Sequence, residues 1–341
     1  MMRYIFHTLL LMLLFPVLSY NTPAPKLVST RIQILTPFSV NLHLSDTFNI
    51  AIIANIYTDT RPDSLVMAKY PTDSVLAVKT AFALKNKLED SPVFADYDFP
   101  VYNYRRDDNK LYEEGLSLDV AAQLAKDVQA DYLFTVDIVN THIWYDIAYA
   151  EHDGVNISYA SSNVPYKFIF RFYNIRSNRI EDTQIVNDTL VIETSSSWVR
   201  DAMDLFKEII IGREAVTMAC EQAGESYAEL IAPHWTDEIR YYYNDGSRDM
   251  DRANKYVDNQ QWLEAMDIWM KYSASSNQKQ AAMACFNMAL ACEMADDFGL
   301  ATEWLNLAKK KDSGISIMEY ETILQIRIKQ LEKLKIENTI K

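Results

Sequence analysis

The chain has 341 residues, 49% of them hydrophobic, and a formal net charge of −14 at pH 7. This length predicts two domains, each with a hydrophobic core. The acidic balance argues against nucleic acid as a partner, because phosphates require clustered Lys and Arg and no basic stripe occurs. An anionic membrane surface is an equally poor partner.

The N-terminal segment is typical of a secretory signal. One basic residue precedes an apolar run from Thr8 to Leu18, which is too short to cross a bilayer, since that needs about 20 residues. The small residues that follow place the cleavage between Ser19 and Tyr20, so we predict a signal peptide over residues 1–19. The alternative is a buried N-terminal helix of a cytosolic protein.

The residue after the predicted cleavage site argues against a lipid anchor. Bacterial lipoproteins are acylated on a cysteine there, whereas Tyr20 has no thiol and the first cysteine is Cys220. Residues 20–29 contain two prolines and predict an extended linker. We expect an exported chain, periplasmic or outer-envelope associated, that is not lipidated at Tyr20 and has no transmembrane segment after cleavage.

Predicted strands alternate with predicted helices in the next part of the chain. A helical apolar spacing begins after Asp73 or Ser74, and Ser117 caps a second helix that ends near Val128. The predicted strands are 30–42, 48–59, 91–104 and 130–143. This alternation implies crossover connections and at least partly parallel pairing.

An antiparallel hairpin is predicted after these elements. Residues 165–175 and 179–193 form its strands and a polar turn joins them. The alternation from Phe168 to Phe172 places aromatic rings on one face, and Arg171 points to the other face.

A helical link is predicted to close the first domain. Helical spacing begins near Trp198, Gly212 could bend or break it, and residues 223–243 belong to the link. A turn signal follows, so we predict an α/β domain over residues 30–245 and a helical domain over 246–341.

The C-terminal part contains an internal repeat with an offset of 36 residues, which aligns Ala265 with Ala301. The pattern resembles the tetratricopeptide repeat, a helix–turn–helix unit. Ala253 and Ala289 stand where that family has glycine, and its closing proline is absent. The alternative is an ordinary pair of helical hairpins. A last amphipathic helix over 315–335 would cover the stack.

The sequence lacks the motifs of common chemistries. Only seven glycines occur, and no predicted strand is followed by a glycine-rich phosphate loop. No Gly-x-Ser-x-Gly elbow exists. We therefore predict no cofactor, no catalytic residue and no enzymatic activity.

One stretch carries residues that could ligate a metal. His142 and His152 flank residues 143–151, which include Asp146 and Glu151. Their spacing matches no metal motif, so we predict no metal site and interpret the stretch as a polar, aromatic loop.

Three Asp-Ser/Thr-apolar triplets resemble sites that Bacteroidetes O-glycosylate in exported proteins. They nominate Ser64, Ser74 and Thr189 as possible acceptors. Helix capping and turn formation are the competing interpretations.

The whole layout resembles a family of uncharacterised Bacteroidetes envelope proteins. The residues that carry this resemblance are "ILTPFSV" before the first long strand, Pro233 and Trp235 in the link, and the repeat positions. The α/β part is also similar, in element order, to the domain shared by the TolB N-terminus, the curli-secretion lipoprotein and lipoprotein activators of peptidoglycan synthases. The predicted fold is a mixed βαβαβ sheet with an antiparallel hairpin, followed by all-α tetratricopeptide-like repeats.

Two functions are expected from this layout. The first is a non-enzymatic envelope adaptor or scaffold whose repeats bind a protein partner or peptide in their concave groove. Its candidate contact residues are Tyr256, Trp262, Trp269 and Trp304; burial in the repeat core is the alternative for each. The second is a hydrolase of an envelope polymer that uses carboxylates near Asp146 and Glu151.

Overall fold

The computed structural model describes residues 26–45, 48–57, 73–106, 114–152, 155–196, 212–314 and 318–339. These residues form two units. The helical unit comprises residues 26–32 and 237–329, and the sheet unit comprises 33–236 and 330–339. The chain thus contains a mixed α/β sheet region and a C-terminal region of several helices. Three elements contribute residues to both units: β1 (Lys26–Thr36), β8 (His234–Asn244) and α10 (Met318–Thr339).

The sheet unit is built on three parallel strands. They are β2 (Ile50–Tyr57), β3 (Val101–Arg106) and β4 (Tyr132–Thr141), with β2 between the other two. Two helices connect them, α2 (Asp73–Glu89) and α3 (Leu118–Val128). The almost uninterrupted apolar run of β2 is buried on both faces, because α2 covers one face and α3 the other. The predicted parallel pairing and the Ser117 cap of α3 are confirmed.

Three antiparallel strands extend this sheet. They are β5 (Trp144–His152), β6 (Val155–Asn174) and β7 (Arg179–Ser196). The long β6 pairs with β4 and β5 along one edge and with β7 along the other. The predicted stripe from Phe168 to Phe172 lies in the main hydrophobic core. The hairpin prediction is therefore confirmed.

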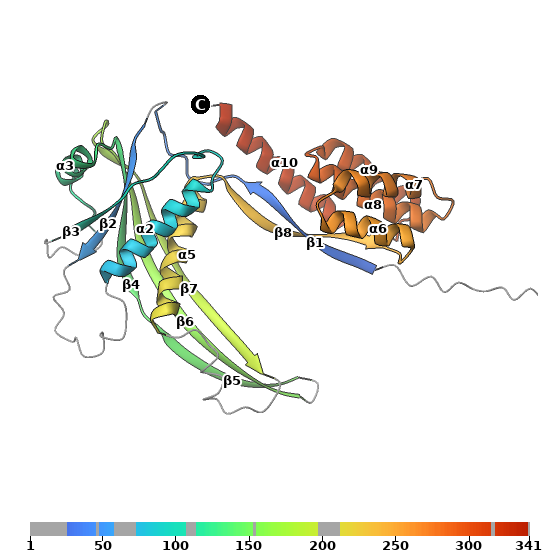
Figure 1. Cartoon of the computed structure of the whole chain (residues 1–341), viewed down its shortest axis with the longest axis horizontal. Coiled ribbons are helices and arrows are strands. Elements are labelled where there is room, and N and C mark those ends of the chain that lie inside the picture. The colour runs from blue at the N-terminus through green and yellow to red at the C-terminus, as the bar shows by residue number, and fades with distance from the viewer. Residues whose placement is uncertain are drawn as a thin grey trace, which may run out of the picture. The chain divides into compact units, whose positions relative to one another are not determined.

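Helix α5 (Arg213–Ile231) lies beside α2 on one face of the sheet (Figure 1). Gly224 permits this contact, because a Cβ there would lie 2.3 Å from the Thr80 carbonyl oxygen. Gly212 precedes the first turn of α5 with a φ of 61°, a backbone conformation that glycine adopts readily. The predicted helical stretch from Trp198 to Ile211 lies outside the described residues.

Three sequence predictions of local structure are wrong. Residues 144–152 form strand β5 instead of a loop, and residues 234–244 form strand β8 instead of a helical link. Both segments have an aromatic-rich alternating pattern that suits a strand. Strand β1 begins at Lys26, inside the predicted linker 20–29, and pairs with β8.

The helical unit contains two helical hairpins and a further helix. The first hairpin is α6 (Arg248–Asp258) and α7 (Trp262–Ser273), the second is α8 (Gln278–Met294) and α9 (Phe298–Lys311), and α10 follows. Their turns are equivalent across the predicted offset. Gln260 and Asp296 both have positive φ, 59° and 55°. The internal repeat is thus present in the backbone as well as in the sequence.

None of the helices in the described ranges combines the length and apolarity that crossing a bilayer requires. The predicted signal peptide, with Ser19 and Tyr20, lies outside the described residues.

Candidate functional site

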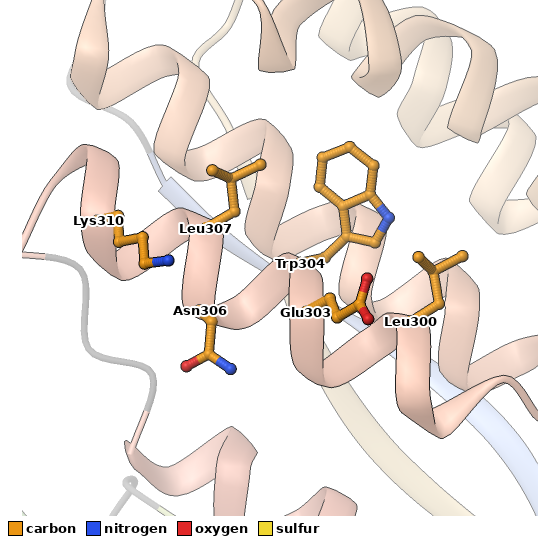
Figure 2. Close-up of a pocket in the computed structure, with 6 residues that line it drawn as sticks. All are labelled: Leu300, Glu303, Trp304, Asn306, Leu307 and Lys310. Carbon is orange, nitrogen blue, oxygen red and sulfur yellow. The ribbon is translucent and has the colours of Figure 1, made fainter.

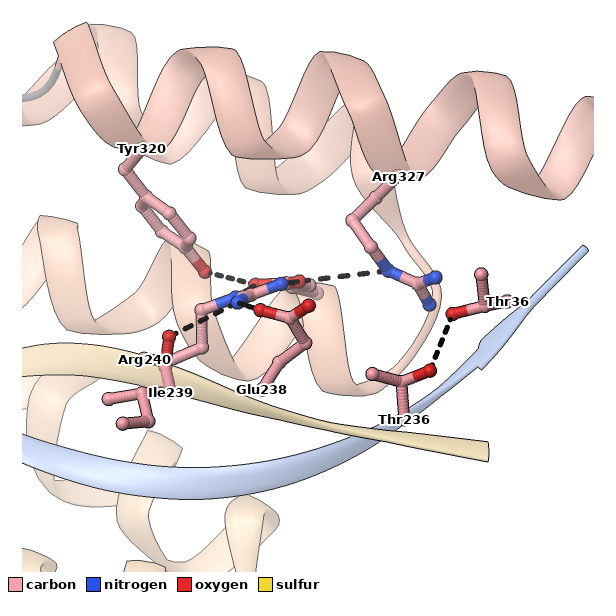
Figure 3. Close-up of polar contacts among 8 residues, drawn as sticks. Thr36, Thr236, Glu238, Ile239, Arg240, Tyr320 and Arg327 are labelled. Atoms are coloured by element: carbon pink, nitrogen blue, oxygen red, sulfur yellow. Dashed lines mark hydrogen bonds and ion pairs between the residues drawn. The ribbon is translucent and has the colours of Figure 1, made fainter. Parts of the chain in front are cut away.

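Strand β8 is anchored to the helices by a buried charge cluster (Figure 3). Glu293 of α8 is 1% exposed and accepts hydrogen bonds from Arg240 Nε and Nη2 of β8, at 3.1 and 3.0 Å. Tyr320 of α10 donates its hydroxyl to Glu293 Oε2 at 2.7 Å. Arg327 lies 3.9 Å from Glu293 Oε1, and Glu238 pairs with Arg240 at 3.4 Å. Two arginines and two glutamates therefore balance in charge.

The environment of this cluster shifts the pKa values of its members. Burial would lower the pKa of Arg240, but hydrogen bonding to Glu293 raises it above its ordinary value. Burial and the adjacent Glu293 carboxylate raise the pKa of Tyr320 well above 10.0. Burial lowers the pKa of Arg327. The cluster has the properties of a structural tie between β8, α8 and α10.

An asparagine of α8 holds the backbone of β8 directly. Asn287 Oδ1 accepts the Tyr243 N–H at 2.7 Å, and Asn287 Nδ2 donates to the Tyr243 carbonyl at 2.8 Å. The Tyr243 ring contacts Phe286 edge-on at 5.1 Å. Tyr242 packs near Trp269 and hydrogen-bonds Asn254 of α6. The helices thus hold an extended segment of their own chain, strand β8.

The structure separates the four predicted contact residues. Trp269 is fully buried, so it cannot touch a partner directly in this conformation. Tyr256 and Trp262 are half-buried, and Trp262 Nε1 donates to the Gln260 side chain at 3.2 Å. Trp304 alone lines a described hollow. These assignments therefore stay predictions, with Trp304 the best placed for contact.

The hollow runs along α9 and has a volume of about 530 Å³ (Figure 2). Its lining side chains are Leu300, Glu303, Trp304, Asn306, Leu307 and Lys310. Figure 2 shows Leu300, Trp304 and Leu307 pointing to one side of the helix and Asn306 to the other. Leu300 and Leu307 are 38% and 37% exposed. The indole N–H of Trp304 is buried without an acceptor among the described residues. The surface is a shallow apolar stripe with a polar border.

The internal repeat shows why this stripe is open. Ile268 of α7 corresponds to Trp304 of α9, and Ser273 corresponds to Lys309. Ile268 and Ser273 are buried, whereas Trp304 is half-buried and Lys309 is exposed. A terminal repeat normally presents a polar outer face. The outer face of α9 keeps three large apolar residues instead, which suits contact with another helix.

A second buried charge cluster lies in the sheet unit. Asp137 of β4 is fully buried and accepts from Asn55 Nδ2 of β2 at 2.7 Å and from Arg171 Nη1 of β6 at 2.6 Å. Arg106 of β3 lies 3.9 Å from Asp137. Strands β2 and β4 are neighbours in the sheet. Helix α2, which follows β2, covers one face, and helix α3, which precedes β4, covers the other. The cluster therefore lies at a topological switch point.

The amino-acid sequence gives little sign of this cluster. The only signal was a polar residue inside each of two apolar runs, Asn55 in "IAIIANIY" and Asp137 in "YLFTVDIV". Arg171 was correctly placed opposite the aromatic stripe, but it is buried. A cavity of about 310 Å³ adjoins Arg106 and the start of α3. Asp137 interacts with Asn55, Arg171 and Arg106, so the cluster connects strands β2, β3, β4 and β6 and can be explained as a structural feature.

The carboxylates of the hydrolase hypothesis do not meet. Asp146 and Glu151 both lie on β5, five positions apart in a regular ladder, so their side chains point to opposite faces. Both are exposed, and Asp146 accepts from Trp144 Nε1 and Asn163 Nδ2. This pair cannot act on a single bond in the described arrangement. Among the described residues, no three His, Cys, Asp or Glu side chains are placed to hold a metal ion.

The other nominated positions lie in different places. Thr189 is half-buried on β7, Ser74 is in the first turn of α2, and Ser64 lies outside the described residues. The three cysteines are free and buried, and burial raises the pKa of Cys285 and Cys292 to about 11. Glycosylation therefore stays a prediction, and the buried thiols are packing residues.

Comparison with known families gives two matches. A model described as a domain of unknown function (DUF8603) matches residues 48–243. A second model, also described as a domain of unknown function (DUF6340), matches residues 251–332. No curated protein matches the chain.

Comparison with solved structures gives matches of low similarity. A putative neuraminyllactose-binding hemagglutinin homologue from Helicobacter pylori is 12% identical, with 56% of this chain and 87% of that chain covered and a TM-score of 0.27. A hypothetical protein from Chlamydia trachomatis is 13% identical, with coverages of 44% and 74% and a TM-score of 0.20. A lipoprotein from Neisseria meningitidis is 9% identical, with coverages of 46% and 90% and a TM-score of 0.15.

Proposed function

The chain belongs to the family described as a domain of unknown function (DUF8603), and from its own residues we propose that it is a non-enzymatic adaptor or scaffold of the cell envelope. Its tetratricopeptide-like helices bind a helix of another protein molecule. The observation that carries this proposal is the apolar hollow on α9. Export and envelope location belong to the same proposal and rest on the N-terminal sequence.

The binding surface of this adaptor is the outer face of α9. The side of the helices that faces β8 is filled by Arg240, Tyr242 and Tyr243 of the chain itself. On α9, Leu300, Trp304 and Leu307 follow the i, i+4, i+7 spacing of a helix-packing stripe. A partner helix would cover this stripe and bury the exposed parts of Leu300 and Leu307.

Crosslinked capture from the native envelope tests the proposal. The full-length chain is compared with Trp304→Ala and with Leu263→Ala as a matched control. Leu263 is a 74%-exposed apolar residue of α7, outside the hollow. We expect a discrete protein adduct with the unmodified chain and with Leu263→Ala, and its loss with Trp304→Ala. An adduct that survives Trp304→Ala with unchanged yield would refute the α9 site.

A further inference from the structure

The hollow on α9 is self-complementary in charge. Glu303 and Lys310 both line it and are seven residues apart, which is two helical turns, so they lie on the same flank of α9. Neither forms an ion pair with another described residue. Leu300, Trp304 and Leu307 form the adjacent apolar flank. The face therefore carries one negative and one positive charge, symmetric about a point between Asn306 and Leu307.

We propose that the protein molecule bound on α9, the site on which the proposed function rests, is a second copy of this chain, with the two α9 helices antiparallel. A twofold axis near Asn306 and Leu307 turns the same flank of each helix toward the other. Glu303 of each copy then lies opposite Lys310 of the other copy, and Trp304 packs against Leu307 of the other copy. In such an isologous interface, every contact occurs twice.

The charge pattern also selects the direction of pairing. In a parallel arrangement about a twofold axis, the flank that carries Glu303 and Lys310 would lie on opposite sides of the interface in the two copies, so these charges would not meet. Only the antiparallel arrangement brings the two flanks together and pairs each Glu303 with Lys310 of the other copy. A single-helix stripe is at the low end of interface sizes, so the association is weak and reversible.

Sedimentation velocity of the full-length chain over a wide concentration range tests this inference. We expect a reversible monomer–dimer equilibrium. Glu303→Lys and Lys310→Glu each turn two attractions into two repulsions, and each should weaken dimerisation about tenfold or more. Both residues lie on the α9 surface, so these variants should keep the circular dichroism spectrum of the unmodified chain.

Mixing the two charge variants tests the pairing of Glu303 with Lys310 most directly. The Glu303→Lys chain is positive at both positions and the Lys310→Glu chain is negative at both. In an antiparallel heterodimer each position therefore faces an opposite charge, and heterodimers should form with the affinity of the unmodified chain. Leu307→Ala should weaken the dimer because it removes the apolar contact with Trp304. A dimer that responds to none of these changes forms elsewhere and would overturn the inference.

The outcomes also separate this inference from the proposed function. A chain that stays monomeric at every concentration overturns the second-copy inference. If that chain still captures an envelope protein through Trp304, the adaptor function stands with a different partner. If dimerisation follows the charge rules but envelope capture yields only the chain itself, the protein is a self-assembling scaffold.

Discussion

Two sides of the helical unit differ in how their apolar surface is covered. On the side of α8, strand β8 of the same chain covers the helices. The side chain of Asn287 hydrogen-bonds the β8 backbone, and Arg240 of β8 pairs with Glu293. On the outer face of α9, Leu300 and Trp304 meet no such segment among the described residues and remain partly exposed. Buried polar pairing stabilises the side that faces β8, whereas the uncovered apolar stripe on α9 is the surface on which the proposed binding depends.

The largest difference should separate the two repeat tryptophans. Trp269 is fully buried on the β8 side, so Trp269→Ala should lower the free energy of unfolding by about 3–5 kcal/mol. Trp304→Ala should cost much less stability, because the ring is half-buried. Urea unfolding followed by circular dichroism measures both. Equal losses would show that the two sides are not distinct.

Removal of Glu293 should destabilise the side of the helical unit that faces β8. Glu293→Ala leaves Arg240 and Arg327 buried around a missing carboxylate, and should destabilise the chain by about 3–5 kcal/mol. Glu264→Ala, an exposed site on α7, is the matched control and should change stability by no more than about 0.5 kcal/mol. Similar unfolding midpoints for both variants would remove the structural role of the cluster.

A smaller loss should follow from Asn287→Ala. The change leaves the N–H and carbonyl of Tyr243 without their side-chain partner, which should cost about 1–3 kcal/mol. Amide hydrogen exchange of peptides covering β8 should accelerate at the same time. Asn306→Ala, on the α9 surface, serves as the control, and faster β8 exchange in that variant would contradict the assignment.

The smallest expected effect depends on pH. Burial raises the pKa of Tyr320 well above 10.0, so the folded state holds this proton more tightly than the unfolded state does. The stability contributed by Tyr320 is full below about pH 10 and is lost as the pH rises toward the folded pKa. Tyr320→Phe should therefore reduce the fall in stability above about pH 10 by up to about 1.4 kcal/mol per pH unit. An unchanged alkaline profile in urea unfolding would argue against this burial.

Periodicity was enough to predict the elements that are regular in pattern. The run around Ile52, the aromatic stripe at Phe170 and the repeated alanines Ala265 and Ala301 define strands and hairpins that the structure contains. The β8 strand was missed because its alternating pattern is carried by Arg240, Tyr242 and their exposed neighbours, and its partner β1 is far away in the sequence.

The candidate site was predictable only in part. The sequence predicts Trp304 as one of four aromatic contact residues of the repeats, but residue type does not separate it from Trp269, which is fully buried. The occupation of the opposite side by β8 depends on long-range pairing of Arg240 with Glu293. The spacing of residues in the sequence cannot reveal such a long-range contact. For this reason the predicted concave groove differs from the exposed apolar surface found on α9.

Photo-crosslinking from α9 tests the central claim most directly. A photoreactive residue replaces Leu307 in the full-length chain, and the same residue replaces Leu263 on α7 as the control position; crosslinking is done in the native envelope. We expect a protein adduct from position 307, none from position 263, and loss of the adduct when Trp304→Ala is added. Equal adducts from both positions, or an adduct only from position 263, would contradict the claim that α9 carries the binding face.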